Sequence, residues 1–177
     1  MRLITADQFV TQPWKNGGGV THEIAREDRD GQLLWRLSIA EVASDGPFSA
    51  FPGLTRILTV IAGAGLHLHT PEGCLEALPY TPVRFSGDTA IDSRLIDGPV
   101  RDFNLIWDAA RLSATVQPLD SALPDCPPAP GRRYALLALT TLARPAIPAG
   151  AVAFFDQAPS QPAAGFQGLL VTIEPAA

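Results

Sequence analysis

Residues 13–42 read PWKNGGGVTHEIAREDRDGQLLWRLSIAEV and predict an antiparallel β-hairpin that is entered through a glycine corner. Segment 20–26 alternates like a strand, Asp30 and Gly31 are favoured turn residues, and segment 32–42 forms the returning strand. Three adjacent glycines cost more chain entropy on folding than an ordinary loop needs. They indicate backbone conformations closed to other residues, or the close approach of another group.

The turn fixes a register for this hairpin. With Asp30 and Gly31 at its centre, the expected pairs are Arg29 with Gln32, Ala25 with Arg36, Glu23 with Ser38, and Thr21 with Ala40. Side chains alternate between the two faces of a strand, so one face is polar and the other apolar. The polar face contains Thr21, Glu23, Arg36 and Ser38, and the apolar face contains Ile24, Trp35, Leu37 and Ile39.

The rest of the chain predicts an all-β protein. The 17 prolines and 15 glycines separate short runs rich in Val, Ile, Leu, Phe and Thr, which is typical of an antiparallel sandwich or barrel. A capping box of Thr5 and Gln8 predicts a helical turn through about Thr11. Further strands are expected at 54–62, 66–70, 74–78, 83–88, 91–96, 100–107, 112–119, 134–142, 151–155 and 168–174.

The domain organisation follows from a change in composition. Residues 1–120 are expected to form the main barrel, with 112–119 completing its sheet system, and residues 121–133 a Pro-rich connector. The strands within 134–177 are too few for an independent sheet. We therefore expect them to pair with the first part, complete a second lobe, and make 1–177 one compact unit.

Composition excludes some classes of partner. With 46% apolar residues and a formal charge of −5, the chain lacks the clustered Lys and Arg that nucleic acid or an anionic membrane surface requires. No signal-peptide core or membrane-length apolar run is present, so we predict a cytoplasmic protein. Cys74 and Cys126 are expected to be free thiols. Exposed strand edges leave formation of a homodimer open.

The glycine corner carries groups that suit an anion. Lys15, the amide of Asn16 and the backbone N–H groups of Gly17, Gly18 and Gly19 could hold a carboxylate. The order of residues fits neither a phosphate loop nor a dinucleotide fingerprint, because the lysine precedes the glycines and a strand follows them. The alternative is a tight turn with a solvated lysine.

Other polar residues have two interpretations each. The polar hairpin face is either ligand-facing or a structural ion pair on an exposed sheet. Arg56 stands among apolar neighbours, so if it is buried it needs a partner such as Glu23 or a bound anion; otherwise it is an edge-strand arginine in water. Asp102 and Asn104 share one face of a late strand, where they could bond to a ligand or to buried backbone. No catalytic base or nucleophile is specified.

Five motifs resemble the HutD/Ves family of the cupin superfamily. They lie at 13–24, 35–40, 46–56, 85–88 and 102–104. The resemblance implies a cupin-like (RmlC-like) antiparallel β-barrel in a two-lobed bicupin form, without the usual metal ligands. It also implies a link in some members to histidine utilisation, with a binding or regulatory role toward a pathway metabolite, and in others to stress response. The family often continues from the last motif toward a pair of basic residues, whereas this chain has Leu-Ile-Trp-Asp.

His67 and His69 point the same way on a strand and could bind one metal. Their spacing departs from the cupin metal motif: Gly63 is too near, Glu72 comes one residue early, and no histidine follows. We therefore predict ordinary strand histidines, no metal and no cofactor.

The leading hypothesis is a non-metal cupin that binds a small carboxylate metabolite, with urocanate or N-formylglutamate as candidates. The expected ligand-binding residues are Trp14, Lys15, Asn16, Gly17, Gly18, Gly19, Thr21, Glu23, Arg36, Ser38, Phe48, Ser49, Arg56 and Asn104. The alternative is a metal-dependent cupin enzyme, an isomerase or dioxygenase, that uses His67 and His69. A third hypothesis is a protein-interaction module with an exposed apolar patch and no enclosed polar cavity.

Overall fold

The computed structural model describes residues 1–119, 129–159, 162 and 164–176. Cys126 and residues 121–128 of the predicted connector lie outside the described residues. The chain divides into two compact units: Val10–Asp108, called here the 10–108 unit, and Met1–Phe9 with Ala109–Ala177, called the terminal unit. The named strands pair antiparallel, and apart from one short 3-10 turn the described secondary structure is β, so the predicted all-β class is confirmed.

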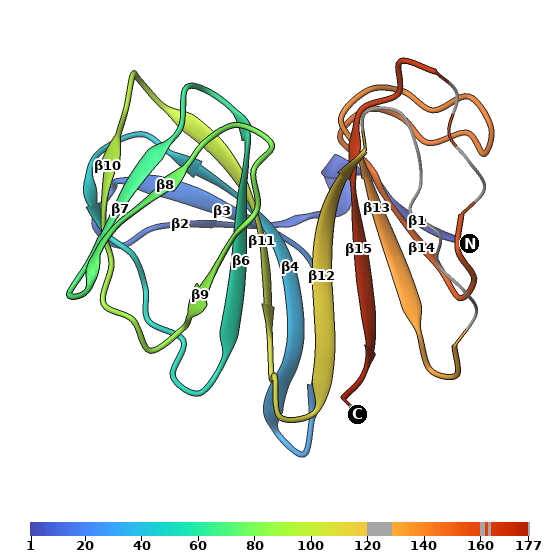
Figure 1. The fold of residues 1–177 in the computed structure, drawn as a ribbon. Coiled ribbons are helices and arrows are strands. Elements are labelled where there is room, and N and C mark those ends of the chain that lie inside the picture. Colours follow the sequence, from blue (N-terminus) through green and yellow to red (C-terminus); the bar gives the residue numbers. More distant parts are fainter. Residues whose placement is uncertain (120–128, 160–161, 163, 177) are drawn as a thin grey trace. The chain divides into compact units, whose positions relative to one another are not determined.

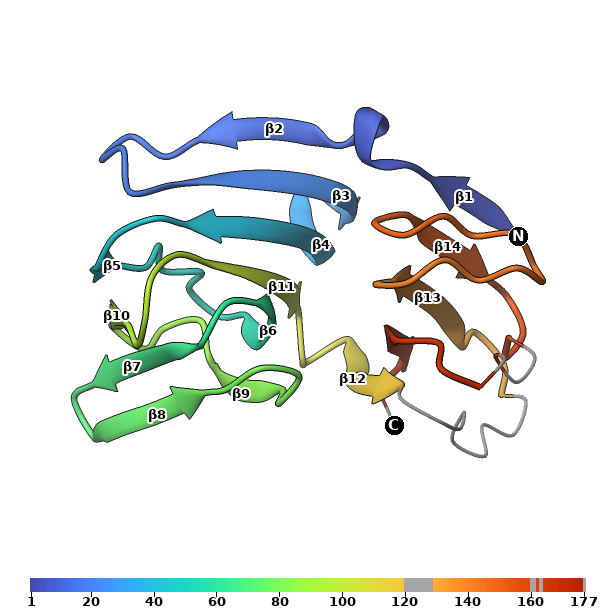
Figure 2. The same cartoon turned by 90° about the horizontal axis from the view of Figure 1, so that it is seen from above.

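The 10–108 unit contains two sheets (Figures 1 and 2). The six-stranded sheet has the order β2 (Val10–Pro13), β3 (Gly19–Arg29), β4 (Gln32–Val42), β11 (Val100–Trp107), β6 (Thr55–Ala62), β9 (Val83–Ser86). The four-stranded sheet has the order β5 (Gly46–Pro47), β10 (Asp92–Leu95), β7 (Leu66–Thr70), β8 (Gly73–Ala77). One core cluster joins the two sheets, since it contains Leu58 and Val60 of β6 together with Leu66 and Leu68 of β7.

Strand register in the larger sheet places polar side chains beside this core. Across β4, β11 and β6, one row of paired residues is Ala40, Asp102 and Val60, and the next is Ser38, Asn104 and Leu58. A further row pairs Arg36 with Ile106 and Ile106 with Arg56. Paired residues in an antiparallel sheet share a face. The inward face therefore changes from apolar near Val60 to polar near Arg56.

The hairpin of β3 and β4 follows the predicted register at both ends. Asp30 and Gly31 have φ values of 55° and 74°, as a two-residue hairpin turn of the primed type requires. The pairs Arg29 with Gln32, Glu23 with Ser38, and Thr21 with Ala40 are confirmed. The predicted pair of Ala25 with Arg36 is wrong, because Ala25 pairs with Leu37. Irregularities after Glu23 and after Glu27 shift the register and then restore it.

The terminal unit contains one five-stranded sheet. Its order is β1 (Arg2–Ile4), β14 (Val152–Phe155), β13 (Arg133–Ala138), β15 (Gly168–Pro175), β12 (Leu112–Leu119). A core cluster that includes Leu136, Phe166 and Leu170 packs on one face of this sheet. The capping box is present at the turn η1 (Ala6–Gln8). That turn ends at Gln8 rather than near Thr11, since β2 already begins at Val10.

The terminal sheet corrects one prediction about strand pairing. Residues 112–119 do not complete the first sheet system, because β12 pairs along its whole length with β15. The C-terminal strands do pair with segments that precede the connector, namely β1 and β12. The two units thus differ in their boundaries from the predicted 1–120 and 134–177. A single compact unit and the bicupin arrangement stay predictions.

Candidate functional site

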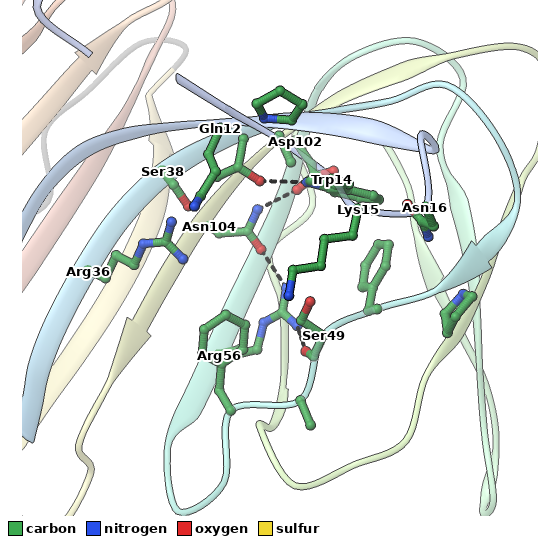
Figure 3. Close-up of a pocket in the computed structure, with 17 residues that line it drawn as sticks. Gln12, Trp14, Lys15, Asn16, Arg36, Ser38, Ser49, Arg56, Asp102 and Asn104 are labelled. Carbon is green, nitrogen blue, oxygen red and sulfur yellow. Dashed lines mark hydrogen bonds between the residues drawn. The ribbon is translucent and has the colours of Figure 1, made fainter. Parts of the chain in front are cut away.

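A cavity of about 690 Å³ lies within the 10–108 unit (Figure 3). Strands β2, β3, β4, β6 and β11, the glycine corner and the loop after β5 supply its walls. The lining residues are Gln12, Pro13, Trp14, Lys15, Asn16, Thr21, Arg36, Ser38, Ala40, Pro47, Phe48, Ser49, Ala50, Phe51, Arg56, Asp102 and Asn104. Ten of the fourteen residues predicted from the sequence are in this set: Trp14, Lys15, Asn16, Thr21, Arg36, Ser38, Phe48, Ser49, Arg56 and Asn104.

Arg56 is the buried cation of the cavity, with 7% of its surface exposed. Its guanidinium donates from Nη1 to the backbone oxygen of Ser49 at 3.2 Å and from Nη2 to Oδ1 of Asn104 at 3.0 Å. The guanidinium also lies 5.1–5.5 Å from the ring centroids of Phe48, Phe51 and Phe85, within cation–π range. Burial lowers the pKa of Arg56 to about 10, so the group stays charged at neutral pH.

Arg36 is a second cation of the cavity wall, and it forms an ion pair with Glu23. Its Nε lies 2.6 Å from Oε2 of Glu23, and both side chains are largely covered, with 16% and 22% exposed. The partner that the sequence suggested for Arg56 therefore bonds to Arg36 instead. Glu23 itself is not among the cavity-lining residues. Arg36 thus forms an ion pair and also lines the cavity, while the ligand-facing interpretation of the polar hairpin face stays a prediction.

Asp102 is a buried carboxyl group at the cavity wall, with 1% of its surface exposed. Nδ2 of Asn104 donates to Oδ1 of Asp102, while Oδ2 has no hydrogen-bond partner among the described residues. Burial raises the pKa of Asp102 to about 7, and the hydrogen bond from Asn104 and the charge of Arg56 oppose that rise. Asn104 thus connects the buried cation to the buried acid (Figure 3).

The glycine corner positions Trp14 and Lys15. Nε1 of Trp14 donates to Oγ1 of Thr21 at 2.8 Å, and the indole meets Phe48 edge to face at 6.3 Å between centroids. The Lys15 side chain points into the cavity (Figure 3). A Cβ on Gly19 would lie 2.4 Å from the backbone oxygen of Glu41 and 3.1 Å from the Trp14 ring. Gly19 is therefore required for the close approach of two backbone segments beneath Trp14.

The glycine amides do not play the role predicted for them. The N–H of Gly17 donates to the backbone oxygen of Trp14 at 3.0 Å, and the N–H of Gly18 donates to Oδ1 of Asn16 at 3.0 Å. Gly19 belongs to β3 and pairs with Val42. None of Gly17, Gly18 and Gly19 lines the cavity. These glycines shape the corner, and hydrogen bonds within it occupy the N–H groups of Gly17 and Gly18.

His67 and His69 lie away from the cavity. Leu66 and Leu68 of the same strand are in the core, so the alternating histidines face outward. Nε2 of His67 is 3.6 Å from Oε1 of Glu76, and the His67 side chain is 40% exposed. Across the parts of the chain that the structure describes, no group of three or more His, Cys, Asp and Glu residues is placed to hold a metal ion.

Seven lining residues were not in the expected ligand-binding set, although Asp102 had been named as a possible ligand contact. They are Gln12, Pro13, Ala40, Pro47, Ala50, Phe51 and Asp102. The alternation that places Asp102 on the face of Asn104 was available in the sequence. Burial of Asp102 could not be inferred, because strands β4 and β6, remote in sequence, cover it from both sides. No helix among the described residues is long and apolar enough to span a membrane.

The fold and the cavity together define a cupin-like β-protein with a pocket lined by three cationic side chains and one carboxyl group. The sequence matches the HutD family over residues 6–146, and the chain belongs to this family. A Pseudomonas putida relative, described as an uncharacterised 21.2 kDa protein in the hutC 3' region, is 40% identical over 123 residues, or 68% of this chain and 65% of that protein. Protein Ves of Escherichia fergusonii is 34% identical over 112 residues, or 60% of this chain and 58% of Ves. The matched segments thus span less than two thirds of these relatives.

Among the solved structures that match nearly the whole chain, two are about 30% identical to it. HutD from Pseudomonas fluorescens SBW25, in a formate condition, is 31% identical with a TM-score of 0.83 and 99% coverage of both chains. A conserved protein of unknown function from Pseudomonas aeruginosa PAO1 is 29% identical with a TM-score of 0.80, covering 99% of this chain and 98% of that one.

Proposed function

We propose that this protein binds a small carboxylate metabolite in the cavity of the 10–108 unit, without a metal ion. The observation that carries the proposal is the buried guanidinium of Arg56, which lines the cavity and bonds only to neutral oxygens among the contacts described above. A buried cation is stabilised by a counter-charge at hydrogen-bond distance. A ligand carboxylate would supply that charge.

The surroundings of Arg56 support an anionic ligand over a neutral one. Arg36 and Lys15 line the same cavity, so three cationic side chains face it against the single carboxyl of Asp102. Trp14 and Phe48 add apolar surface for the remainder of the molecule. Small-molecule pockets commonly measure roughly 300–1,000 Å³, and a cavity of about 690 Å³ lies within that range.

Membership of the HutD family suggests which acids to test. The P. putida relative is named for its position in the hutC 3' region, which supports a link to histidine utilisation. Urocanate and N-formylglutamate are the candidate ligands, and the proposed role is regulatory binding in the cytoplasm. His67 and His69 face away from the cavity, so a metal-dependent reaction at those residues would not use this pocket.

Calorimetric titration of each acid into the full chain tests the proposal. We expect saturable binding of at least one acid and, for Arg56→Met, affinity lower by roughly 10- to 100-fold, as for loss of a charged hydrogen-bond donor. The matched control is Arg94→Met, which removes an arginine of β10 whose side chain is 62% exposed and which does not line the cavity. Failure of both acids to bind, or equal affinity after Arg56→Met, would contradict the proposal.

A further inference from the structure

We propose that Asp102 takes up a proton when a carboxylate enters the cavity, so that the pocket binds small acids together with a proton. This inference rests on the proposed function and adds a regulatory property to it. The group concerned is a fully buried side chain of the cavity wall, and one of its oxygens is without a partner among the described residues.

The contacts of Asp102 make it sensitive to a second carboxylate. Its Oδ1 is fixed by Nδ2 of Asn104, and Oδ1 of the same amide accepts from Arg56. A ligand bound at Arg56 would therefore stand one side chain away from Asp102. Two carboxylates in one buried site strongly disfavour double ionisation, and one of them retains a proton.

The charged groups around Asp102 come from every side of the cavity. Arg56 lies on β6, Arg36 lies on β4 and is paired with Glu23 of β3, and Lys15 lies in the glycine corner. In the empty pocket the charge of Arg56 stabilises the ionised form of Asp102 and so opposes the effect of burial on its pKa. A ligand carboxylate bound at Arg56 shares the positive charge of that residue with Asp102. The ionised form of Asp102 is then less stabilised, and its neutral form becomes more favourable.

The proton has a defined place in the bound state. Hydronium or a buffer acid gives up the proton, an O–H bond forms at Asp102, and no other covalent bond changes. Oδ2 is the oxygen without a partner among the described residues, so a hydroxyl there could donate to an acceptor of the ligand. Burial already holds the pKa of Asp102 at about 7, which places the exchange near neutral pH.

Calorimetry with N-formylglutamate in buffers of different ionisation enthalpy measures the proton uptake. Both carboxyls of this probe ionise well below pH 5, so the probe does not titrate in the range used. We expect uptake on the order of half a proton at about pH 7.5 and close to none at about pH 5.5. The dissociation constant should rise by up to about tenfold per pH unit above neutrality.

Two variants assign the proton to its residue. Asp102→Asn should bind the probe with no proton uptake and with an affinity nearly independent of pH. Asp92→Asn, which removes an exposed carboxylate of β10 outside the cavity, should retain the wild-type uptake. A thermal unfolding scan checks that each variant is folded.

The outcomes separate this inference from the proposed function. Binding without proton uptake, or with the same uptake after Asp102→Asn, overturns the inference and leaves carboxylate binding intact. Failure of the wild-type protein to bind N-formylglutamate and urocanate at any pH between about 5.5 and 8.5 overturns both.

Discussion

The guanidinium of Arg56 donates a 3.0 Å hydrogen bond from Nη2 to Oδ1 of Asn104, which joins two buried residues 48 positions apart in the chain. Antiparallel pairing of β6 with β11 produces this contact, because the two residues lie in neighbouring rows of the sheet. The bond orients the amide so that its nitrogen faces Asp102. The charge state of the cavity therefore depends on strand register as well as on residue type.

The buried acid predicts how stability depends on pH. An unfolded Asp102 ionises near the ordinary aspartate pKa of 3.8, whereas burial raises the pKa of the folded group to about 7. The native state thus binds more protons in this window, so the contribution of Asp102 to the free energy of unfolding falls as pH rises from 3.8 to about 7 and is flat above.

The Asp102→Asn substitution should remove the pH dependence of the free energy of unfolding that arises from this carboxyl group. We expect the variant to gain stability relative to wild type, and the gain at about pH 8 to exceed that at about pH 5 by on the order of 2 kcal/mol. Urea unfolding at the two pH values measures the difference. An equal effect of the substitution at both values would show that the carboxyl does not titrate in this window.

Glu23→Gln should strengthen carboxylate binding. The substitution removes the negative charge next to Arg36 and leaves an amide oxygen that can still accept from Nε. We expect affinity for N-formylglutamate to rise by about two- to fivefold, as for a partly covered charge pair. Calorimetry at low and high salt measures the effect, which should shrink with added salt. A loss of affinity would show that the charge of Glu23 is needed to position Arg36.

Gly19→Ala should destabilise the corner that holds Trp14. Its Cβ would lie 2.4 Å from the backbone oxygen of Glu41, so backbone must move. We expect a loss of about 1–3 kcal/mol in the free energy of unfolding and weaker ligand binding. Gly18→Ala is the matched control. The atom nearest to its added Cβ would be the side-chain oxygen of Ser44, at 3.0 Å, rather than a backbone atom. Equal stability of the two variants would contradict this account of the corner.

Replacing both outward histidines should leave binding unchanged. His67 and His69 share a strand with core residues but lie outside the cavity lining. We expect the double alanine variant to bind N-formylglutamate with the wild-type affinity in calorimetry. A substantial loss of affinity would show that these histidines contribute to binding, and it would support the metal-dependent alternative.

Local sequence patterns predicted much of the fold and of the cavity. Alternation and the Asp30–Gly31 turn were enough to place Arg36 and Ser38 on one face. The apolar neighbours of Arg56 left burial and an edge-strand position equally open, and the structure shows that Arg56 is buried. The two register shifts in β3 were not predictable, since they preserve the pairing at both ends. The pairing of β12 with β15 joins segments far apart in the chain, for which the sequence contains no local signal.

Two other features of the site were not predicted from the sequence, and each has a physical reason. The amides of Gly17 and Gly18 were expected to face a ligand, but the carbonyl of Trp14 and the side chain of Asn16 are close enough in sequence to accept from them first. The perturbed carboxyl of Asp102 arises from burial between β4 and β6, which depends on the assembled sheet rather than on neighbouring residues.

Crystal structures of the protein grown with saturating urocanate and with saturating N-formylglutamate test the central claim most directly. The account predicts ligand density in the cavity of the 10–108 unit, with the carboxylate within hydrogen-bond distance of the Arg56 guanidinium and the remainder beside Trp14 and Phe48. Both acids bound elsewhere, or a cavity that holds only water with either acid, would contradict it.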